Sequence, residues 1–246
     1  MIKAIILFTK VAIVTLAALL FTSCKYAVNF GDGIEGSGNI TTETRNVTQD
    51  FKKIEVGYGI QVEVEQSNTK SVVVKADDNL QKHITTTVEN GVLKIESDHS
   101  YNSTQTPTVT VQMPVINALE ATSGSKITGK NNIITPLIAV KSSSGSEINL
   151  TVEADEISVE STSGSTIEVR GKAIKLDTSS SSGSSIDAEN LLANEVYAQA
   201  TSGSSTDVSP IVTLKGKASS GASVDYHKTP KTLTKEENSG GSVSEN

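Results

Sequence analysis

Acidic side chains recur at one fixed position in the second half of the chain. They stand four residues after successive glycines, and the last four of the series are Glu168, Asp187, Asp207 and Asp225. If their segments stack in register, about 4.8 Å apart, neighbouring carboxylates repel by about 0.9 kcal/mol in water before salt screening. A solvated surface tolerates that repulsion, so the ordinary interpretation is a polar face. The alternative is a weak site for hard divalent cations such as Ca²⁺, which take several carboxylate oxygens.

Catalytic chemistry has less support in the residues. Glycoside hydrolysis uses two opposed carboxyl groups, and no spacing singles out such a pair. A calcium-dependent polysaccharide lyase would place acids beside a basic residue, and Glu168 and Arg170, on one face of one strand, are the nearest approach. The histidines His83, His99 and His227 show no ligand spacing and are expected on the surface. We therefore assign no catalytic residue, no metal site and no cofactor, and keep a carbohydrate-active enzyme as an alternative.

These acids belong to a repeat that is marked by a serine–glycine pair. Its glycines step by 21, 19, 19, 20, 18 and 19 residues, a near-constant period that is typical of stacked-repeat proteins. A glycine is expected where the chain turns a corner with positive φ, and the flanking serine hydroxyls can satisfy backbone groups there. The corner glycines are Gly124, Gly145, Gly164, Gly183, Gly203, Gly221 and Gly240.

Apolar and polar residues alternate around each glycine, which indicates strands with one buried face. An apolar residue stands three positions after most of the glycines and seven before most of them, as Ile167 and Ile157 do around Gly164. No helical segment intervenes. The sequence thus predicts an all-β solenoid with parallel stacked rungs of about 19–20 residues, which bury their apolar rows against one another. A flexible Gly/Ser linker would not hold isoleucine at a fixed offset.

Residues 37–116 are predicted to form an N-terminal β region that precedes the repeats at 117–246. Taking Gly57 as a corner puts Ile60 at the usual offset, which predicts a degenerate first rung. Asn90-Gly91, between two apolar runs, is a strong signal for a two-residue hairpin. A helix is expected only at 78–83, for about a turn and a half.

Composition and charge limit the partners. The 246 residues are 36% hydrophobic and 4% aromatic, which suits a thin core of Ile, Val and Leu. The net charge of −7 becomes −9 when Lys3 and Lys10 are removed with the leader. Nucleic-acid binding needs a basic surface, and anionic lipid attracts basic segments. Neither nucleic acid nor electrostatic docking on lipid is therefore expected.

The N-terminus carries a targeting signal. Lys3 and Lys10 precede an apolar run at 11–21, which is too short to span a bilayer but fits the centre of a signal peptide. Cys24, the only cysteine, follows and resembles the lipidated cysteine of bacterial lipoproteins; an ordinary secretory peptide is the alternative. We predict a signal peptide at 1–23, a lipid anchor at Cys24 and a polar tether at 24–36. The protein would then be held at the outer membrane of a Gram-negative bacterium, on either face.

Several short motifs follow one another in a fixed order. They are Gly36-Ser37-Gly38-Asn39, Thr44-Arg45-Asn46-Val47, Phe51-Lys52-Lys53-Ile54-Glu55-Val56, Gly59-Ile60-Gln61-Val62, Asp78-Asn79-Leu80, the run 88–95, Met113-Pro114 and the Ser-Gly-Ser repeats. Together they resemble the head-GIN-domain family of "putative auto-transporter adhesins", from about Gly36 to the C-terminus. The resemblance implies a right-handed, single-stranded β-helix-like solenoid in secreted or lipid-anchored bacterial proteins, with adhesion as a role. The family has no agreed catalytic residues to carry over.

These features favour a non-catalytic envelope lipoprotein that presents a solenoid surface for adhesion or for binding a polysaccharide or partner protein. Two alternatives stay open: a carbohydrate-active β-helix enzyme, either a lyase or a hydrolase, and a purely structural envelope protein. The end strands of a solenoid have an unpaired edge, so oligomers can form through those ends. The charged run 235–238 in the last rung is expected to act as a cap.

Overall fold

The computed structural model of the chain describes residues 33–246. Ile34–Asn246 form one compact unit, whose structure is almost entirely strand. The predicted signal peptide, the lipidation site Cys24 and most of the tether lie outside the described residues. Among the residues that are described, no helix is long and apolar enough to cross a membrane.

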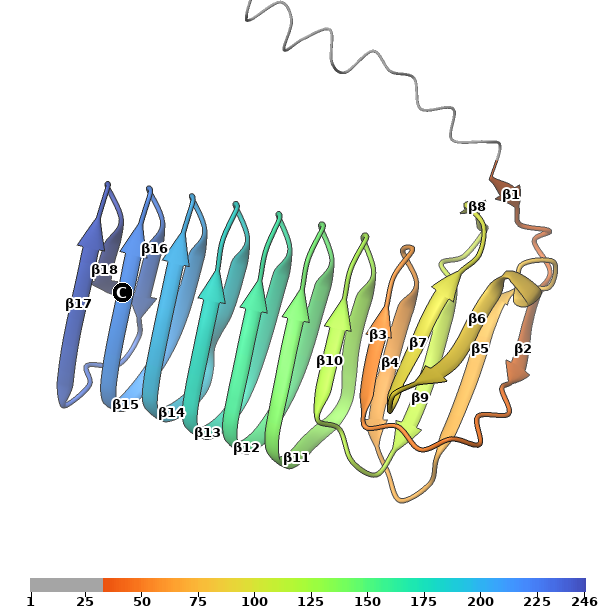
Figure 1. The fold of residues 1–246 in the computed structure, drawn as a ribbon, viewed down its shortest axis with the longest axis horizontal. Helices are drawn as coiled ribbons and strands as arrows, with labels where there is room; N and C mark the ends of the chain where they lie inside the picture. The colour runs from red at the N-terminus through yellow and green to blue at the C-terminus, as the bar shows by residue number, and fades with distance from the viewer. Residues whose placement is uncertain (1–32) are drawn as a thin grey trace, which may run out of the picture. The chain divides into compact units, whose positions relative to one another are not determined.

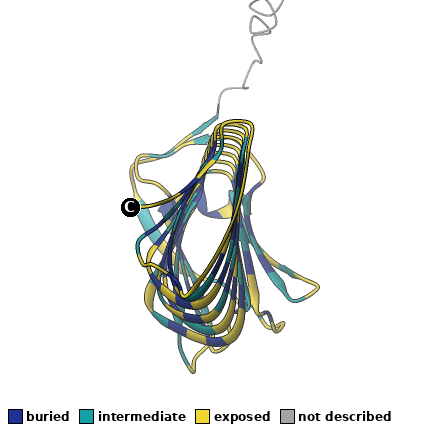
Figure 2. Cartoon of the chain, turned by 90° about the vertical axis from the view of Figure 1, so that its left-hand side faces the viewer, coloured by how far each residue is buried: buried dark blue, intermediate teal, exposed yellow. Residues whose placement is uncertain are grey.

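The serine–glycine repeats stack as parallel rungs, which confirms the predicted solenoid (Figure 1). Each long strand runs along one face, bends, and returns along the other face, so that a sharp corner and a blunt bend alternate (Figure 2). The strands are β10 (Ala118–Ala121), β11 (Lys126–Ser142), β12 (Glu147–Ser161), β13 (Thr166–Ser180), β14 (Ser185–Thr201), β15 (Ser205–Ser219), β16 (Ser223–Tyr226), β17 (Thr232–Asn238) and β18 (Ser242–Glu245).

Columns of buried aliphatic side chains, including the two that the sequence predicts, fill the space between the faces. The residues three positions after the glycines lie in register, with Ile127 opposite Ile148 and Ile148 opposite Ile167. The residues seven positions before the glycines form the second column, in which Ile157 pairs with Leu176. All five side chains are buried. Since burying one such side chain contributes about 1.5–3 kcal/mol, the columns are the main source of stability.

Each residue of the Ser-Gly-Ser corner has a structural role. Serine and glycine both adopt positive φ, as at Ser163 (55°) and Gly164 (72°), which is the pattern of a type I′ turn. The Gly164 amide donates to the Ser182 carbonyl of the next rung at 3.1 Å. The serine after the glycine points inward, and the Ser165 hydroxyl donates to the Ser142 carbonyl at 2.8 Å. This hydrogen bonding fixes the rungs in register at the corner.

The first rung does form, but the predicted position of its corner is wrong. Its strands are β3 (Lys53–Val56) and β4 (Gln61–Gln66). The residues with positive φ are Tyr58 (63°) and Gly59 (71°), so the corner lies two residues later than Gly57. Val62 pairs with Ile127, and Ile60 takes the buried place that serine has in the repeats. A type I′ turn needs two adjacent residues with positive φ, and Tyr58 accepts that conformation here.

Further strands cover the N-terminal end of the stack. A rung made by β7 (Val92–Ser97) and β9 (Thr108–Met113) pairs in parallel with β3 and β4, although it comes later in the chain. Antiparallel strands then continue the two faces: β6 (Ile84–Glu89) on β7, and β5 (Ser71–Asp77) with β2 (Ile40–Thr44) beyond β9. Two short strands, β1 (Ile34–Glu35) and β8 (Tyr101–Asn102), pair with each other.

The hairpin predicted for this region forms, whereas the predicted helix is shorter than expected. The β6–β7 hairpin turns at Asn90 and Gly91, both with positive φ, as predicted. In place of a turn and a half of helix at 78–83 there is one short 3-10 element, η2 (Gln81–His83).

Charged side chains close the C-terminal end, as the sequence predicted for the last rung. Lys235 and Glu237 pair with the buried positions Gly216 and Ala218, so they stand on the inward face of β17. The Lys235 ammonium donates to the Val243 carbonyl and the Glu237 carboxylate accepts from the Val243 amide, both at 2.6 Å. The Val243 amide and carbonyl, which another strand could use, are thereby satisfied, which is a known way of blunting a sheet edge.

Substitution of two glycines by alanine distinguishes the energetic cost of positive φ from that of a steric clash. Gly183 has φ 70° and free space around it, whereas Gly171, with φ 122°, would place a Cβ 2.1 Å from the Val152 carbonyl oxygen. We expect Gly183→Ala to cost about 1–2 kcal/mol and Gly171→Ala at least twice as much, because the backbone of the neighbouring rung must move. Melting temperatures of the two variants test this, and equal losses would show that the bend relaxes freely.

We expect the cap formed by Lys235 and Glu237 to limit association between copies of the chain. Lys235→Val with Glu237→Val leaves the Val243 backbone groups unsatisfied beside an apolar edge, so we expect the apparent mass in light scattering to rise with concentration. Lys231→Val with Glu236→Val makes the same charge change outside the inward positions and is the control. Unchanged mass in the inward double variant would contradict a capping role.

Candidate functional site

The predicted acidic residues form a continuous column on one face. Glu168 pairs with Asp187, Asp187 with Asp207, and Asp207 with Asp225, on four successive rungs. All four side chains are partly exposed. The column is therefore accessible, and its members stand one strand spacing apart.

Each carboxylate in this column has its own hydrogen-bond or ionic partner. Glu168 forms an ion pair with Arg170 on the same strand. An oxygen of Asp187 accepts from the Glu189 amide at 3.1 Å, and one of Asp207 lies 2.9 Å from Nε2 of His227. Asp225 accepts from the Ser244 hydroxyl at 2.6 Å. These partners offset the repulsion between neighbouring acids and fix the orientation of each carboxylate.

A serine column runs beside the acids. Ser185 pairs with Ser205, and Ser205 with Ser223, two residues before Asp187, Asp207 and Asp225. The Ser205 hydroxyl donates to the Ser185 hydroxyl at 3.2 Å. We call the six residues Ser185, Asp187, Ser205, Asp207, Ser223 and Asp225 the Ser–Asp face. Its signal in the sequence is a serine two positions before an aspartate, repeated in three rungs.

The Ser–Asp face offers hydroxyl and carboxylate oxygens in a repeating pattern. Within residues 33–246, three His, Cys or carboxylate ligand atoms within 4.8 Å of one another occur at His83, Asp98 and His99, away from this face. The acidic column therefore does not hold a preformed three-ligand cation site among the described residues. Its chemistry suits hydrogen bonding to hydroxyl or amino groups, and the cation stripe stays a prediction.

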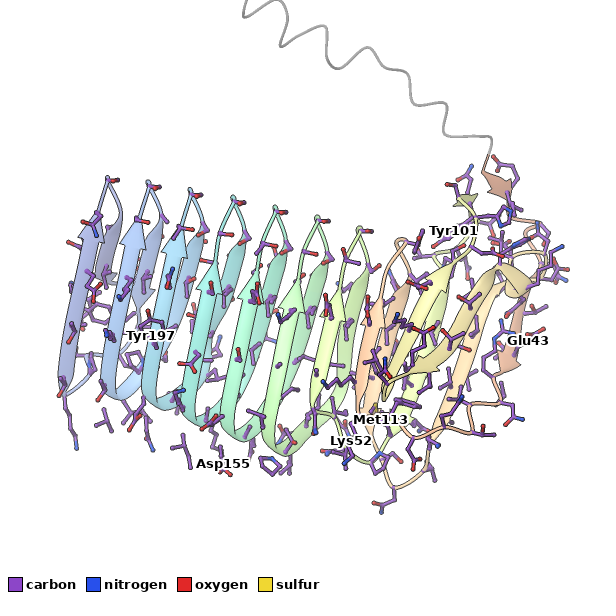
Figure 3. The ribbon with its side chains drawn as sticks, viewed as in Figure 1. Glu43, Lys52, Tyr101, Met113, Asp155 and Tyr197 are labelled. Carbon is purple, nitrogen blue, oxygen red and sulfur yellow. The ribbon has the colours of Figure 1, made fainter. Side chains whose placement is uncertain are left out.

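A recess lies beside the first corner, where two tyrosines separated in sequence come together. It has a volume of about 370 Å³, and Tyr58, His99 and Tyr101 are among the residues that line it. The Tyr101 hydroxyl donates to the Tyr58 carbonyl at 2.6 Å, and burial raises the pKa of Tyr101 to about 12. Tyr101, labelled in Figure 3, stands at the N-terminal end of the stack.

The comparisons with known proteins agree with this fold. Residues 50–230 match the family described as "putative auto-transporter adhesin, head GIN domain". The chain belongs to this family. No curated protein matches it.

Solved structures share the architecture of this head GIN domain. A "putative adhesin" from Bacteroides fragilis aligns with a TM-score of 0.82 and 19% identity, over 87% of this chain and 100% of that one. A "putative lipid binding protein" from Parabacteroides distasonis gives 0.71 and 19%, over 87% and 99%. A "putative adhesin" from Parabacteroides merdae gives 0.69 and 17%, over 88% and 100%. At these identities the likeness shows the fold.

Gly38, from one of the motifs behind the family resemblance, and Thr104 both donate hydrogen bonds to the buried carboxylate of Asp77. We call this arrangement of Gly38, Asp77 and Thr104 the clasp. The Gly38 amide and the Thr104 hydroxyl both donate to Oδ1 of the buried Asp77 at 2.8 Å, and the Thr104 amide donates to Oδ2 at 3.2 Å. Gly36 must lack a side chain, since a Cβ would lie 2.5 Å from Oδ2 of Asp77. Burial raises the pKa of Asp77, but the hydrogen bonds from Thr104 and Gly38 outweigh it and leave the pKa below its ordinary value.

The clasp should give the domain an acid-sensitive step in stability. Because the folded-state pKa of Asp77 is lowered, its ionised form stabilises the fold above the unfolded-state pKa of about 3.9, and this contribution is lost as pH falls through the folded-state pKa. We expect Asp77→Asn to lower the melting temperature at pH 7, and the gap from wild type to narrow below about pH 4. Asp50→Asn, at an exposed ion pair with Lys70, is the control. A gap that stays constant with pH would contradict the assignment.

Proposed function

We propose that this head GIN domain is a non-catalytic, lipid-anchored envelope module whose Ser–Asp face binds a linear polyhydroxyl polymer. The observation that carries the proposal is the register of β14, β15 and β16, which places Ser185, Ser205 and Ser223 in one column and their aspartates in the next. Successive rungs thus repeat one donor–acceptor pair. A polymer whose units repeat can engage several rungs at once, so weak contacts add through effective concentration.

Charge narrows the class of polymer. The chain carries a net charge of −7, and three carboxylates line the face. An acidic polysaccharide would meet like charge, whereas neutral or amino-bearing sugars can donate hydrogen bonds to carboxylates, which are roughly twice as strong as neutral ones. We therefore propose neutral or amino polysaccharides, with adhesion to such a polymer as the role.

The anchor belongs to the same proposal. Lipidation at Cys24 would hold the domain at the outer membrane and leave Ile34–Asn246 free to meet a polymer, on whichever side of that membrane the protein stands. The family description as adhesins supports a place in the cell envelope. Surface protease accessibility on intact cells distinguishes the two membrane faces.

The enzyme alternative makes a different demand on Glu168. A lyase would need that residue beside a basic group that is free to act, and Arg170 is its ion-pair partner. Turnover of a polysaccharide that Glu168→Gln abolishes would favour the carbohydrate-active enzyme. Binding without turnover favours the adhesin, and neither binding nor turnover leaves the structural envelope protein.

The binding test uses residues 25–246, which contain the whole compact unit, on an array of neutral, amino and acidic glycans. We expect Asp187→Asn with Asp207→Asn to weaken binding by at least about tenfold, since a hydrogen bond to a charged group contributes about 1.5–3 kcal/mol. Glu156→Gln with Glu195→Gln removes the same charge from the other face and should bind as wild type does. Loss of binding in both double variants would point to bulk charge, and unchanged binding in the first would overturn the assignment of the face.

The anchor is tested separately in cells. We expect the full-length chain to incorporate labelled fatty acid and to sediment with membranes, and Cys24→Ser to do neither. Label that persists in the variant would contradict lipidation at this residue, without bearing on the Ser–Asp face.

A further inference from the structure

Two histidines that lie apart in sequence share one carboxylate near the N-terminal end of the stack. Nδ1 of His83 and Nδ1 of His99 each lie 2.8 Å from Oδ1 of Asp98. The imidazole rings face each other edge-on, with centroids 4.7 Å apart. One ligand atom from each of the three residues falls within 4.8 Å of the others. We propose that His83, Asp98 and His99 form a binding site for a divalent transition-metal ion of the zinc class.

The backbone holds the three residues in place without a metal. His83 ends η2, and its amide donates to the carbonyl of the fully buried Leu80 at 2.9 Å. The Asp98 amide donates to the His83 carbonyl at 3.1 Å, which ties the two segments together. The Ser97 hydroxyl donates to the His99 carbonyl at 2.7 Å. Such preorganisation spares a bound metal the entropic cost of ordering its ligands.

The donor set selects the kind of ion. Two imidazole nitrogens and one carboxylate oxygen suit Zn²⁺ and its neighbours, whereas Ca²⁺ and Mg²⁺ prefer oxygen ligands alone. A metal would bind the Nδ1 and Oδ1 atoms that contact one another in its absence.

The site is open to solvent on one side. The side chains of Asp98 and His99 are 49% and 58% exposed, while that of His83 is 16% exposed. Three protein ligands leave the fourth position of a tetrahedral zinc shell for water or an external group. Since His99 also lines the recess with Tyr58 and Tyr101, a bound metal would stand at the edge of that recess.

The remaining histidine provides a matched control. Nε2 of His227 lies 2.9 Å from Oδ1 of Asp207, which is the same kind of histidine–carboxylate contact with only one imidazole. Nε2 of His227 also lies 4.0 Å from Oε2 of Glu189. If one histidine beside acidic groups sufficed to bind metal, His227 would bind it as well as the cluster does.

The test uses residues 25–246 without a histidine tag, titrated with Zn²⁺ in a calorimeter and with Co²⁺ by visible absorption. We expect one ion per chain, a rise in melting temperature with Zn²⁺ and none with Ca²⁺. Both His83→Ala and His99→Ala should weaken binding by at least about tenfold, and His227→Ala should leave it unchanged.

Metal-free melting curves show whether each variant is folded, and the exposed His99 is the substitution least able to disturb the fold. No Zn²⁺ binding by the wild type, or binding that survives His99→Ala but falls with His227→Ala, would overturn the proposal. Because the cluster lies away from the Ser–Asp face, either result leaves the glycan assignment to its own test.

Discussion

The structure depends on a hydrogen bond that recurs at the sharp corners from Gly59 to Gly221. A glycine amide donates to the serine carbonyl of the next rung, as Gly145 does to Ser163 and Gly183 to Ser202, each at 3.1 Å. This bond sets which residue lies over which, and the aliphatic columns follow from it. The irregularities in register, such as those between Thr128 and Asn132, lie between the two halves of a strand. Variation in rung length is therefore absorbed at the blunt bend, and the corner stays in phase.

Because every rung keeps the same register at the corner, one face can present the same functional groups on successive rungs. A residue's column is decided by its distance from the glycine, so a serine at one offset and an aspartate two positions later, as in Ser205 and Asp207, become neighbouring columns without further design. Substitution of one residue in a rung changes one member of one column and leaves the other members aligned. A surface of this kind matches a ligand that is itself repetitive. The histidine cluster, in contrast, lies where the chain departs from the repeat.

The parts of the fold that the sequence predicts are those in which each residue's role is local. Glycine at a corner and isoleucine at a fixed offset needed no knowledge of the partner strand. The corner at Tyr58 and Gly59 was misplaced because Gly57 offers an equally good glycine, and tyrosine gives no sign that it will take positive φ. The sequence could have indicated part of the histidine site. Counting the same number of residues outward from Asn90 and Gly91 along the two strands of the hairpin places His83 opposite Asp98. What sequence could not show is that two imidazoles would converge on one carboxylate oxygen, which depends on η2 and on the turn after β7.

The ends of the solenoid decide which surfaces remain for partners. At the C-terminal end, a further strand would have to displace Lys235 and Glu237 from the Val243 backbone and bury two charges, which costs several kcal/mol per ion unless they are paired again. At the other end, antiparallel strands continue both faces and end the parallel stacking. Addition of a strand at the C-terminal end is therefore opposed by these two charges, whereas the two faces present ordered side chains on every rung. A ligand that runs across the rungs along a face gains from the repeat, and one that meets an end does not.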